Sequence, residues 1–222
     1  MTEERRPAHV GFAKSAGLGE RRGMGQTYSE MIGAHRVQRR EQLLRSAAEV
    51  LEQGGIRQST MDQVAARAGV SKVILYRYFK SKDALVHAVL EEVVEAILAA
   101  DREEAAWWTD RVRRTLPVAR EHAAAMRLLV RHAAHDPTFG RHLEQLSAAL
   151  VQAVIERETD ILGPEKSAPG PTIMMAEAVT AFMLDSYVRW IEQGDPGRDA
   201  QFVDWITASV RSIVYHWRGL QP

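Results

Sequence analysis

Residues 71–82 gather hydrogen-bond donors of the kind that contact nucleic acid. Lys72 and Arg77 can donate to O6 and N7 of guanine, and Val73 can touch the methyl group of thymine. Hydroxyl and ammonium groups nearby suit phosphate oxygens, which position a protein on DNA without reading its sequence. The predicted DNA-contacting residues are Thr60, Ser71, Lys72, Val73, Tyr76, Arg77, Tyr78 and Lys82.

Two short helices are needed to present these side chains. Thr60 can cap a first helix, and Gln63 stands three residues on and completes a capping box. Gly69 ends that helix, and Ser71 can cap the next one. A tight turn between two short helices is typical of a helix-turn-helix, expected at about 60–79, whose second helix enters the major groove. The expected outer face of that helix holds Lys72, Val73, Tyr76, Arg77 and Tyr78.

The alternative is a helical hairpin that only contributes to a core. It leaves two tyrosines exposed among basic residues with no role. Charge favours the DNA-binding interpretation. The chain has 29 Lys and Arg against 29 Asp and Glu, but residues 36–82 hold ten against four, a balance of +6. Residues 1–35 are nearly neutral at +1, and residues 83–222 carry −7. We therefore expect only the first domain to face phosphates.

Helical periodicity runs through nearly the whole chain from about residue 36, and no stretch alternates like a strand. The predicted fold is all-α, with three parts. Residues 1–35 are rich in glycine and are expected to form a disordered N-terminal extension. Residues 36–82 form the helix-turn-helix domain, and residues 83–222 form a helical body. The expected body helices cover about 103–121, 123–135, 138–161, 172–193 and 199–218, after one that contains residues 86–97.

Residues 39–86 closely resemble the DNA-binding domain of the tetracycline-repressor (TetR) family. The matching motifs are Thr60-Met61-Asp62-Gln63-Val64-Ala65, Ala68-Gly69-Val70-Ser71-Lys72, Leu75-Tyr76-Arg77-Tyr78-Phe79 and Lys82-Asp83-Ala84-Leu85. The family often has Gly-Thr where this chain has Val73-Ile74, and often His where it has Tyr78. These departures bear on the operator sequence rather than on DNA binding itself.

The resemblance implies a ligand-responsive repressor that binds a palindromic operator as a homodimer. Dimerisation is expected through the helices at about 172–193 and 199–218, although both could instead lie in a monomeric core. The implied effector is a small apolar or amphipathic molecule, because Met and aromatic side chains suit an adaptable pocket. The candidate ligand-binding residues are Trp107, Trp108, His122, Met126, Phe139, Met174, Met175, Phe182 and Tyr187.

Three rival functions remain open. A regulator of the same fold could act without an effector or could activate transcription. An α-helical enzyme is the rival from another class, but no catalytic motif or spacing is present. His132 and His135 share a helix face without a carboxylate to complete a metal pattern, so no metal and no cofactor are expected. The chain has no cysteine, no spanning apolar run and no secretory signal, and a cytoplasmic location is expected.

Overall fold

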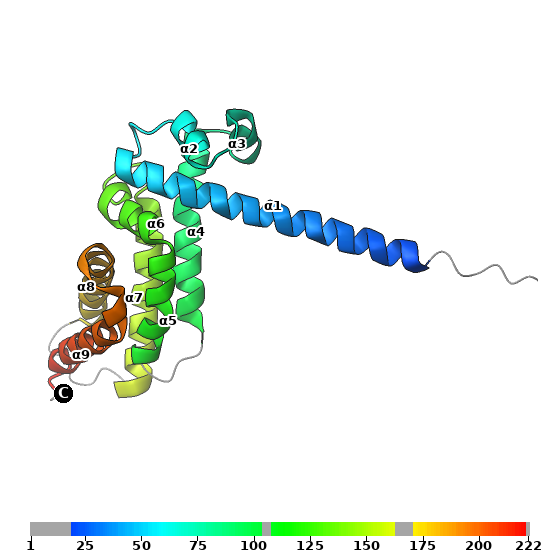
Figure 1. Cartoon of the computed structure of the whole chain (residues 1–222). Coiled ribbons are helices and arrows are strands. Elements are labelled where there is room, and N and C mark those ends of the chain that lie inside the picture. Colours follow the sequence, from blue (N-terminus) through cyan, green and yellow to red (C-terminus); the bar gives the residue numbers. More distant parts are fainter. Residues whose placement is uncertain (1–18, 104–107, 163–170, 221–222) are drawn as a thin grey trace, which may run out of the picture. The chain divides into compact units, whose positions relative to one another are not determined.

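All regular secondary structure in the described residues is helical, which confirms the predicted all-α class (Figure 1). The computed structural model describes residues 19–103, 108–162 and 171–220. Within them, no helix is both long and apolar enough to cross a bilayer. The elements are α1 (Gly19–Gly54), α2 (Met61–Arg67), α3 (Lys72–Tyr78), α4 (Lys82–Arg102), α5 (Trp108–Glu121), α6 (Ala123–Arg127), the π-helix η1 (Leu128–Ala133), α7 (Arg141–Leu162), α8 (Thr172–Gln193), the 3-10 helix η2 (Pro196–Arg198) and α9 (Asp199–Trp217).

The first helix begins earlier than the sequence predicted. We expected it to start near residue 36, but α1 begins at Gly19. No proline interrupts the chain between Pro7 and Pro117, so nothing in this segment removes a helical hydrogen bond. Residues 1–18 lie outside the described residues, and disorder there stays a prediction. Residues 1–41 and 42–222 form separate units, and the contacts below all lie within the second.

One predicted helix of the body has a different form. A single helix was expected over about 123–135, but the chain forms the short α6 followed by the π-helical η1. A π-helix bonds residue i to i+5, and its wider turn is not visible to a search for a 3.6-residue period. Leu128 and Leu129, two neighbours in sequence within η1, are both fully buried.

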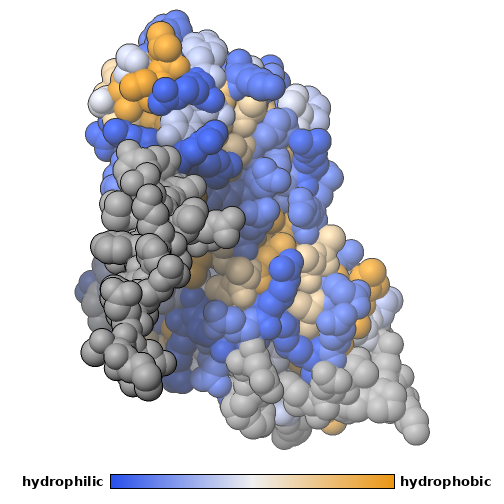
Figure 2. Space-filling view, turned by 90° about the vertical axis from the view of Figure 1, so that its right-hand side faces the viewer, coloured by the Kyte–Doolittle hydropathy of each residue, from blue (hydrophilic) through white to orange (hydrophobic). Residues whose placement is uncertain are grey.

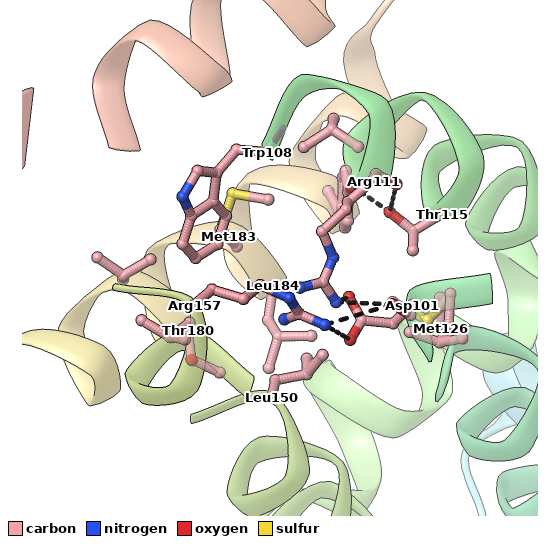
Figure 3. A pocket seen from close by; sticks show the side chains of 15 residues that line it. Asp101, Trp108, Arg111, Thr115, Met126, Leu150, Arg157, Thr180, Met183 and Leu184 are labelled. Carbon is pink, nitrogen blue, oxygen red and sulfur yellow. Dashed lines mark hydrogen bonds and ion pairs between the residues drawn. The ribbon is translucent and has the colours of Figure 1, made fainter. Parts of the chain in front are cut away.

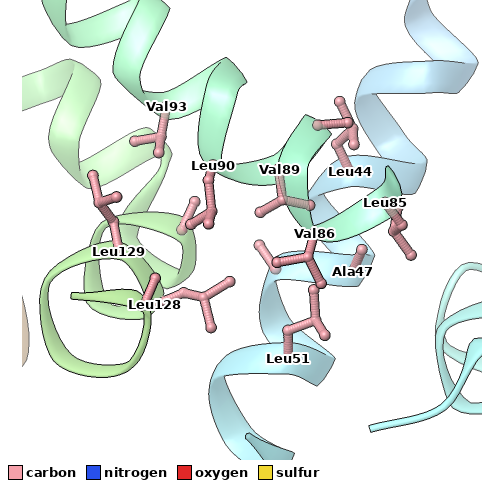
Figure 4. Close-up of a cluster of buried hydrophobic side chains, with 14 of the residues drawn as sticks. Leu44, Ala47, Leu51, Leu85, Val86, Val89, Leu90, Val93, Leu128 and Leu129 are labelled. Carbon is pink, nitrogen blue, oxygen red and sulfur yellow. The ribbon is translucent and has the colours of Figure 1, made fainter. Parts of the chain in front are cut away.

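Helix α4 supplies buried side chains to the helix-turn-helix domain and to the body alike. Val86 of α4 faces Ala47 and Leu51 of α1, and two turns further along Val93 faces Leu129 of η1 (Figure 4). These residues belong to one continuous cluster that includes side chains from α1, α2, α3, α4, η1, α7 and α8. The two predicted domains therefore share a core, and α4 is its common wall.

Ion pairs also join the domains beside this core. Arg57, in the loop before α2, donates to Asp136 in the loop before α7 at 2.9 Å. Arg127 of α6 donates through Nε to Glu52 of α1, also at 2.9 Å, and both of these side chains are largely covered. A partly buried pair loses more on removal of one partner than an exposed pair does. The contacts therefore fix the first domain against the body.

Replacing Leu90 by alanine tests the shared core. Leu90 is fully buried on α4, and a leucine-to-alanine change in a core costs about 2–5 kcal/mol. We expect urea denaturation to show a loss of that size. The matched control is Leu220→Ala, because Leu220 is exposed and its truncation should change stability by less than about 0.5 kcal/mol. Equal effects of the two variants would contradict the shared core.

Candidate DNA interface and ligand pocket

The helix-turn-helix forms with the predicted caps. The N–H of Thr60 donates to Oε1 of Gln63 at 2.8 Å, and the N–H of Gln63 donates to Oγ1 of Thr60 at 3.3 Å, which is the reciprocal capping box. Gly69 adopts φ = +64°, a conformation that favours glycine. Ser71 accepts the N–H of Ile74 at 3.4 Å and starts α3. The turn thus sets the angle of α3 through local hydrogen bonds.

The outer surface of α3 matches the prediction in part. Val73 is 80% exposed and Tyr76 is 42% exposed, and Arg77 is also on the surface. Tyr78 was expected beside them, but it is half-buried and packs against the core next to Phe79. The reason is helical geometry, because Tyr78 lies three residues after the fully buried Leu75 and shares its face.

Figure 1 draws α2 and α3 at the top of the view. At the same height, Figure 2 shows a group of apolar side chains surrounded by hydrophilic ones. An exposed valine on a short basic helix does not stabilise the fold, because its side chain leaves water only when something covers it. Val73 on α3 is therefore available to a partner.

Two of the predicted cationic contacts are already engaged inside the chain. The ammonium of Lys72 donates to Asp62 at 2.8 Å, and this hydrogen bond raises the pKa of Lys72 above its ordinary value. The ammonium of Lys82 donates to the backbone carbonyls of Arg57 at 3.0 Å and Ser59 at 3.2 Å. Lys82 thus closes the loop before α2, a role that the sequence pattern did not reveal.

A pocket of about 600 Å³, measured with the open space at its mouth, lies in the body between α4, α5, α6, α7 and α8 (Figure 3). Most of the lining is hydrocarbon or aromatic. The lining residues are Ile97, Asp101, Trp108, Arg111, Val112, Thr115, Met126, Leu150, Val154, Arg157, Val179, Thr180, Met183, Leu184 and Tyr187.

The structure places only three of the nine candidate ligand residues in this pocket: Trp108, Met126 and Tyr187. Trp107 lies outside the described residues. The other five lie elsewhere because helical spacing alone does not tell which buried face borders a cavity. Phe139 and Met175 are buried in the core, and Met174 and Phe182 are exposed on α8. His122 precedes α6 away from the lining, and burial lowers its pKa.

Sequence reasoning missed the polar part of the pocket. Arg111 is nearly buried, forms an ion pair with the Asp101 carboxylate and donates to the Asp101 carbonyl at 2.9 Å. Arg157 Nη2 lies 3.5 Å from Oδ2 of Asp101, and burial lowers the Arg157 pKa. The sequence did carry one sign of this site. Arg111 is a charged residue next to Val112 on the helix that also holds the apolar Leu116.

A second polar contact holds Tyr187 in the wall. Its hydroxyl lies 2.7 Å from Oγ1 of Thr115. Because Thr115 donates its own proton to the carbonyl of Arg111 at 2.9 Å, Tyr187 is the donor of the pair. Burial raises the pKa of Tyr187, so the phenol stays neutral. Its hydroxyl proton is therefore committed to Thr115, and Tyr187 offers the cavity mainly its ring.

Comparison with known proteins agrees with this geometry. A family model described as "Bacterial regulatory proteins, tetR family" matches residues 43–89. The HTH-type transcriptional activator FasR of Mycolicibacterium smegmatis is 29% identical over 193 residues, which cover 83% of this chain and 84% of FasR.

Solved structures show the same fold over most of the chain. One is a TetR-family transcriptional regulator from Rhodococcus sp., described as putative, with 25% identity and a TM-score of 0.57, covering 79% of this chain and 98% of the other. Another is the transcriptional regulator FadR from Bacillus subtilis in complex with stearoyl-CoA, with 14% identity and a TM-score of 0.59, covering 78% and 97%.

The helix-turn-helix, its exposed basic helix and the all-helical body define a DNA-binding transcriptional regulator. The family match over residues 43–89 and the relatives of similar length support a transcriptional regulator of the TetR family.

Replacing Asp62 by asparagine should tighten binding to duplex DNA. The change frees the Lys72 ammonium and removes a negative charge beside α3. Because an exposed ion pair is worth up to about 1 kcal/mol, the expected gain is about two- to five-fold. Fluorescence anisotropy with a random-sequence duplex at low salt measures it, since phosphate contacts are independent of sequence.

Glu49→Gln is the matched control, because it removes the same charge from Glu49 of α1, the half-buried partner of the exposed Arg67 on α2. If both variants gained affinity equally, the gain would come from the change in net charge and not from Lys72. The gain should also disappear when Lys72→Ala is added to Asp62→Asn. If the double variant kept the gain in affinity, Lys72 would not contact the DNA.

Proposed function

We propose that this protein is a ligand-responsive transcriptional repressor that binds a palindromic operator as a homodimer. The observation that carries the proposal is that α4 borders both functional regions. Ile97 and Asp101, near its C-terminal end, line the pocket, and Val86 and Val89, near its N-terminal end, pack in the core shared with α1. With 21 residues, α4 spans about 30 Å as one rigid rod.

Such a rod can couple the two regions. A ligand that fits the pocket better at one tilt of α4 shifts the protein toward that tilt, and only this difference in affinity provides coupling. Since the helix-turn-helix packs on the other end of α4, its position changes with the tilt. In a dimer, the distance between two α3 helices would then leave the spacing of about 34–36 Å that one DNA turn requires.

The exposed surfaces of α8 and α9 support dimerisation. Met174, Ala178, Ala181 and Phe182 are all exposed and recur on one face of α8. On α9, Trp205 is 51% exposed, beside the small, exposed Ala208, Ser209 and Ser212. Small residues let two helices approach closely, and the large apolar residues need cover. These two helices would form a four-helix interface with their symmetry mates.

The remaining assignments belong to the same proposal. The DNA-binding domain would run to about residue 82, where α4 begins. Base contacts would come from Lys72, Val73 and Arg77, with phosphate contacts from Thr60 and Tyr76. Lys82 would support the interface through its loop, and Ser71 through its cap. The chain would act in the cytoplasm, where a bacterial regulator meets DNA.

An activator is the second candidate, because the relative FasR is named as a transcriptional activator. Ligand response, in turn, is supported by the pocket and by the FadR structure, which holds stearoyl-CoA. A reporter gene behind the selected operator separates the two signs of regulation. Repression predicts higher reporter output when the regulator gene is deleted, whereas lower output would establish activation.

Genomic DNA selection followed by anisotropy tests the DNA-binding part. The selected sequences should share an inverted repeat whose half-sites are centred about one helical turn apart. The logarithm of affinity should fall linearly and steeply with the logarithm of salt concentration. Selection of sites with a single half-site, and no repeat, would refute a dimer that reads a palindrome.

The α8 face yields a direct test of dimerisation. Ala178→Arg places a long cation in the middle of the exposed α8 face and should convert the dimer to a monomer. Light scattering should give twice the 24.9 kDa chain mass for the parent protein and the single mass for the variant. Ala99→Arg is the matched control, because Ala99 is exposed on α4, and it should leave the dimer intact. A parent that is monomeric at micromolar concentration would overturn the proposal.

A further inference from the structure

The pocket contains polar groups that the fold leaves without hydrogen bonds. Arg111 and Thr180 are only 4% and 3% exposed. Within the described part of the chain, nothing accepts from Nε or Nη1 of Arg111, and nothing pairs with Oγ1 of Thr180. Native structures rarely bury such groups unpaired, because each unmade hydrogen bond costs free energy. Both residues line the same pocket, so a bound molecule is the natural partner.

The charges of the pocket are unbalanced as well. Its lining holds the two guanidinium groups of Arg111 and Arg157 and the single carboxylate of Asp101, a net charge of +1. The Tyr187 phenol adds nothing, because burial raises its pKa. Most other lining side chains are apolar, and an uncompensated charge among apolar groups is costly. One negative charge from a ligand would neutralise the site.

We propose that the effector is an amphipathic carboxylate with an apolar body, bound with its head group on Arg111 and Thr180. The carboxylate would accept hydrogen bonds from the guanidinium N–H groups and from the threonine hydroxyl, all of which are donors to an acceptor-only group. Arg157 would supply the balancing charge. Figure 3 shows Arg111, Arg157 and Thr180 reaching the same pocket from α5, α7 and α8. This inference rests on the proposed function, whose effector it specifies.

The apolar part of the ligand follows from the remaining walls. Val112, Leu150, Val154 and Leu184 come from the three helices α5, α7 and α8 and present only hydrocarbon to the cavity. Burial of a methylene group among such side chains contributes about 0.8 kcal/mol. The body would therefore supply most of the affinity, and the head group would supply the discrimination. A neutral or cationic analogue of the same body would leave the donors unpaired and the positive charge unbalanced.

Isothermal titration of the 222-residue chain with three ten-carbon probes tests the head group: decanoate, decanol and decyltrimethylammonium. Decanoate should bind at least about ten-fold more tightly than decanol, since hydrogen bonds to a charged group contribute about 1.5–3 kcal/mol. The ammonium probe should bind most weakly. Equal binding of decanoate and decanol, preference for the cation, or failure of decanoate to bind would each overturn the carboxylate assignment.

Thr180→Val tests the contact with the hydroxyl. Valine keeps the shape of threonine, and the lost hydroxyl has no partner among the described residues, so the melting temperature should not fall. Decanoate affinity should drop about three- to ten-fold, and decanol affinity should stay the same. The matched control is Thr207→Val on α9, whose hydroxyl donates to the Val203 carbonyl at 2.6 Å and lies outside the lining. It should leave decanoate affinity unchanged, and equal losses in both variants would contradict the contact.

Arg157→Gln tests the charge balance. The Arg157 side chain is partly exposed, and its removal keeps the Arg111–Asp101 pair, so the fold should survive. The preference for decanoate over decanol should shrink about ten-fold, because the empty pocket then carries no net charge. An unchanged preference would refute the role of the excess charge.

The response of DNA binding separates this inference from the function on which it rests. Decanoate should lower the affinity for the selected operator duplex in anisotropy. If decanoate binds with the expected preference and operator affinity does not change, the head-group assignment holds and the ligand-responsive function fails. If operator affinity falls equally with decanol, the function holds and the carboxylate assignment fails.

Discussion

The structure depends on one packing constraint, which is that α4 is buried along nearly its whole length. Its buried residues run from Leu85 to Asp101, and they meet the helix-turn-helix at one end and the pocket at the other. A helix that is apolar around most of its circumference needs partners on several sides. Protein interiors are close-packed, so α4 cannot move at one end without repacking at the other. The same contacts that stabilise the fold thus provide a physical link between DNA and ligand.

Local interactions fix the position of α3, the helix proposed to contact DNA. The Thr60 and Ser71 caps and the left-handed Gly69 set α2 and α3 relative to each other. Lys82 fixes the preceding loop by two hydrogen bonds to backbone carbonyls. The exposed Val73, by contrast, contributes nothing to stability in the absence of a partner. Capping residues and contact residues therefore alternate along a short segment, and their types alone do not separate the two roles.

The pocket departs from an ordinary core in a specific way. Packing would favour hydrocarbon at Arg111 and Thr180, since burying unpaired donors costs free energy. The chain instead places one carboxylate between two guanidinium groups and leaves donors unused. Such a local conflict with stability is expected where a site has been kept for binding rather than for folding. The polar cluster of α4, α5 and α7 is for this reason the most informative feature of the body.

The sequence by itself determined the all-helical class, the helix-turn-helix with its caps, and the bounds of α8 and α9 to within a residue. Those features depend on neighbours a few residues apart, so a one-dimensional pattern records them. The tertiary structure decided that Tyr78 turns inward, that Lys82 binds carbonyls, and that Met126 borders a cavity while Phe139 does not. It also brought Asp101, Arg111 and Arg157 together from three helices. Periodicity shows which face of a helix is buried, but only the packing of helices far apart in sequence decides which buried face meets empty space.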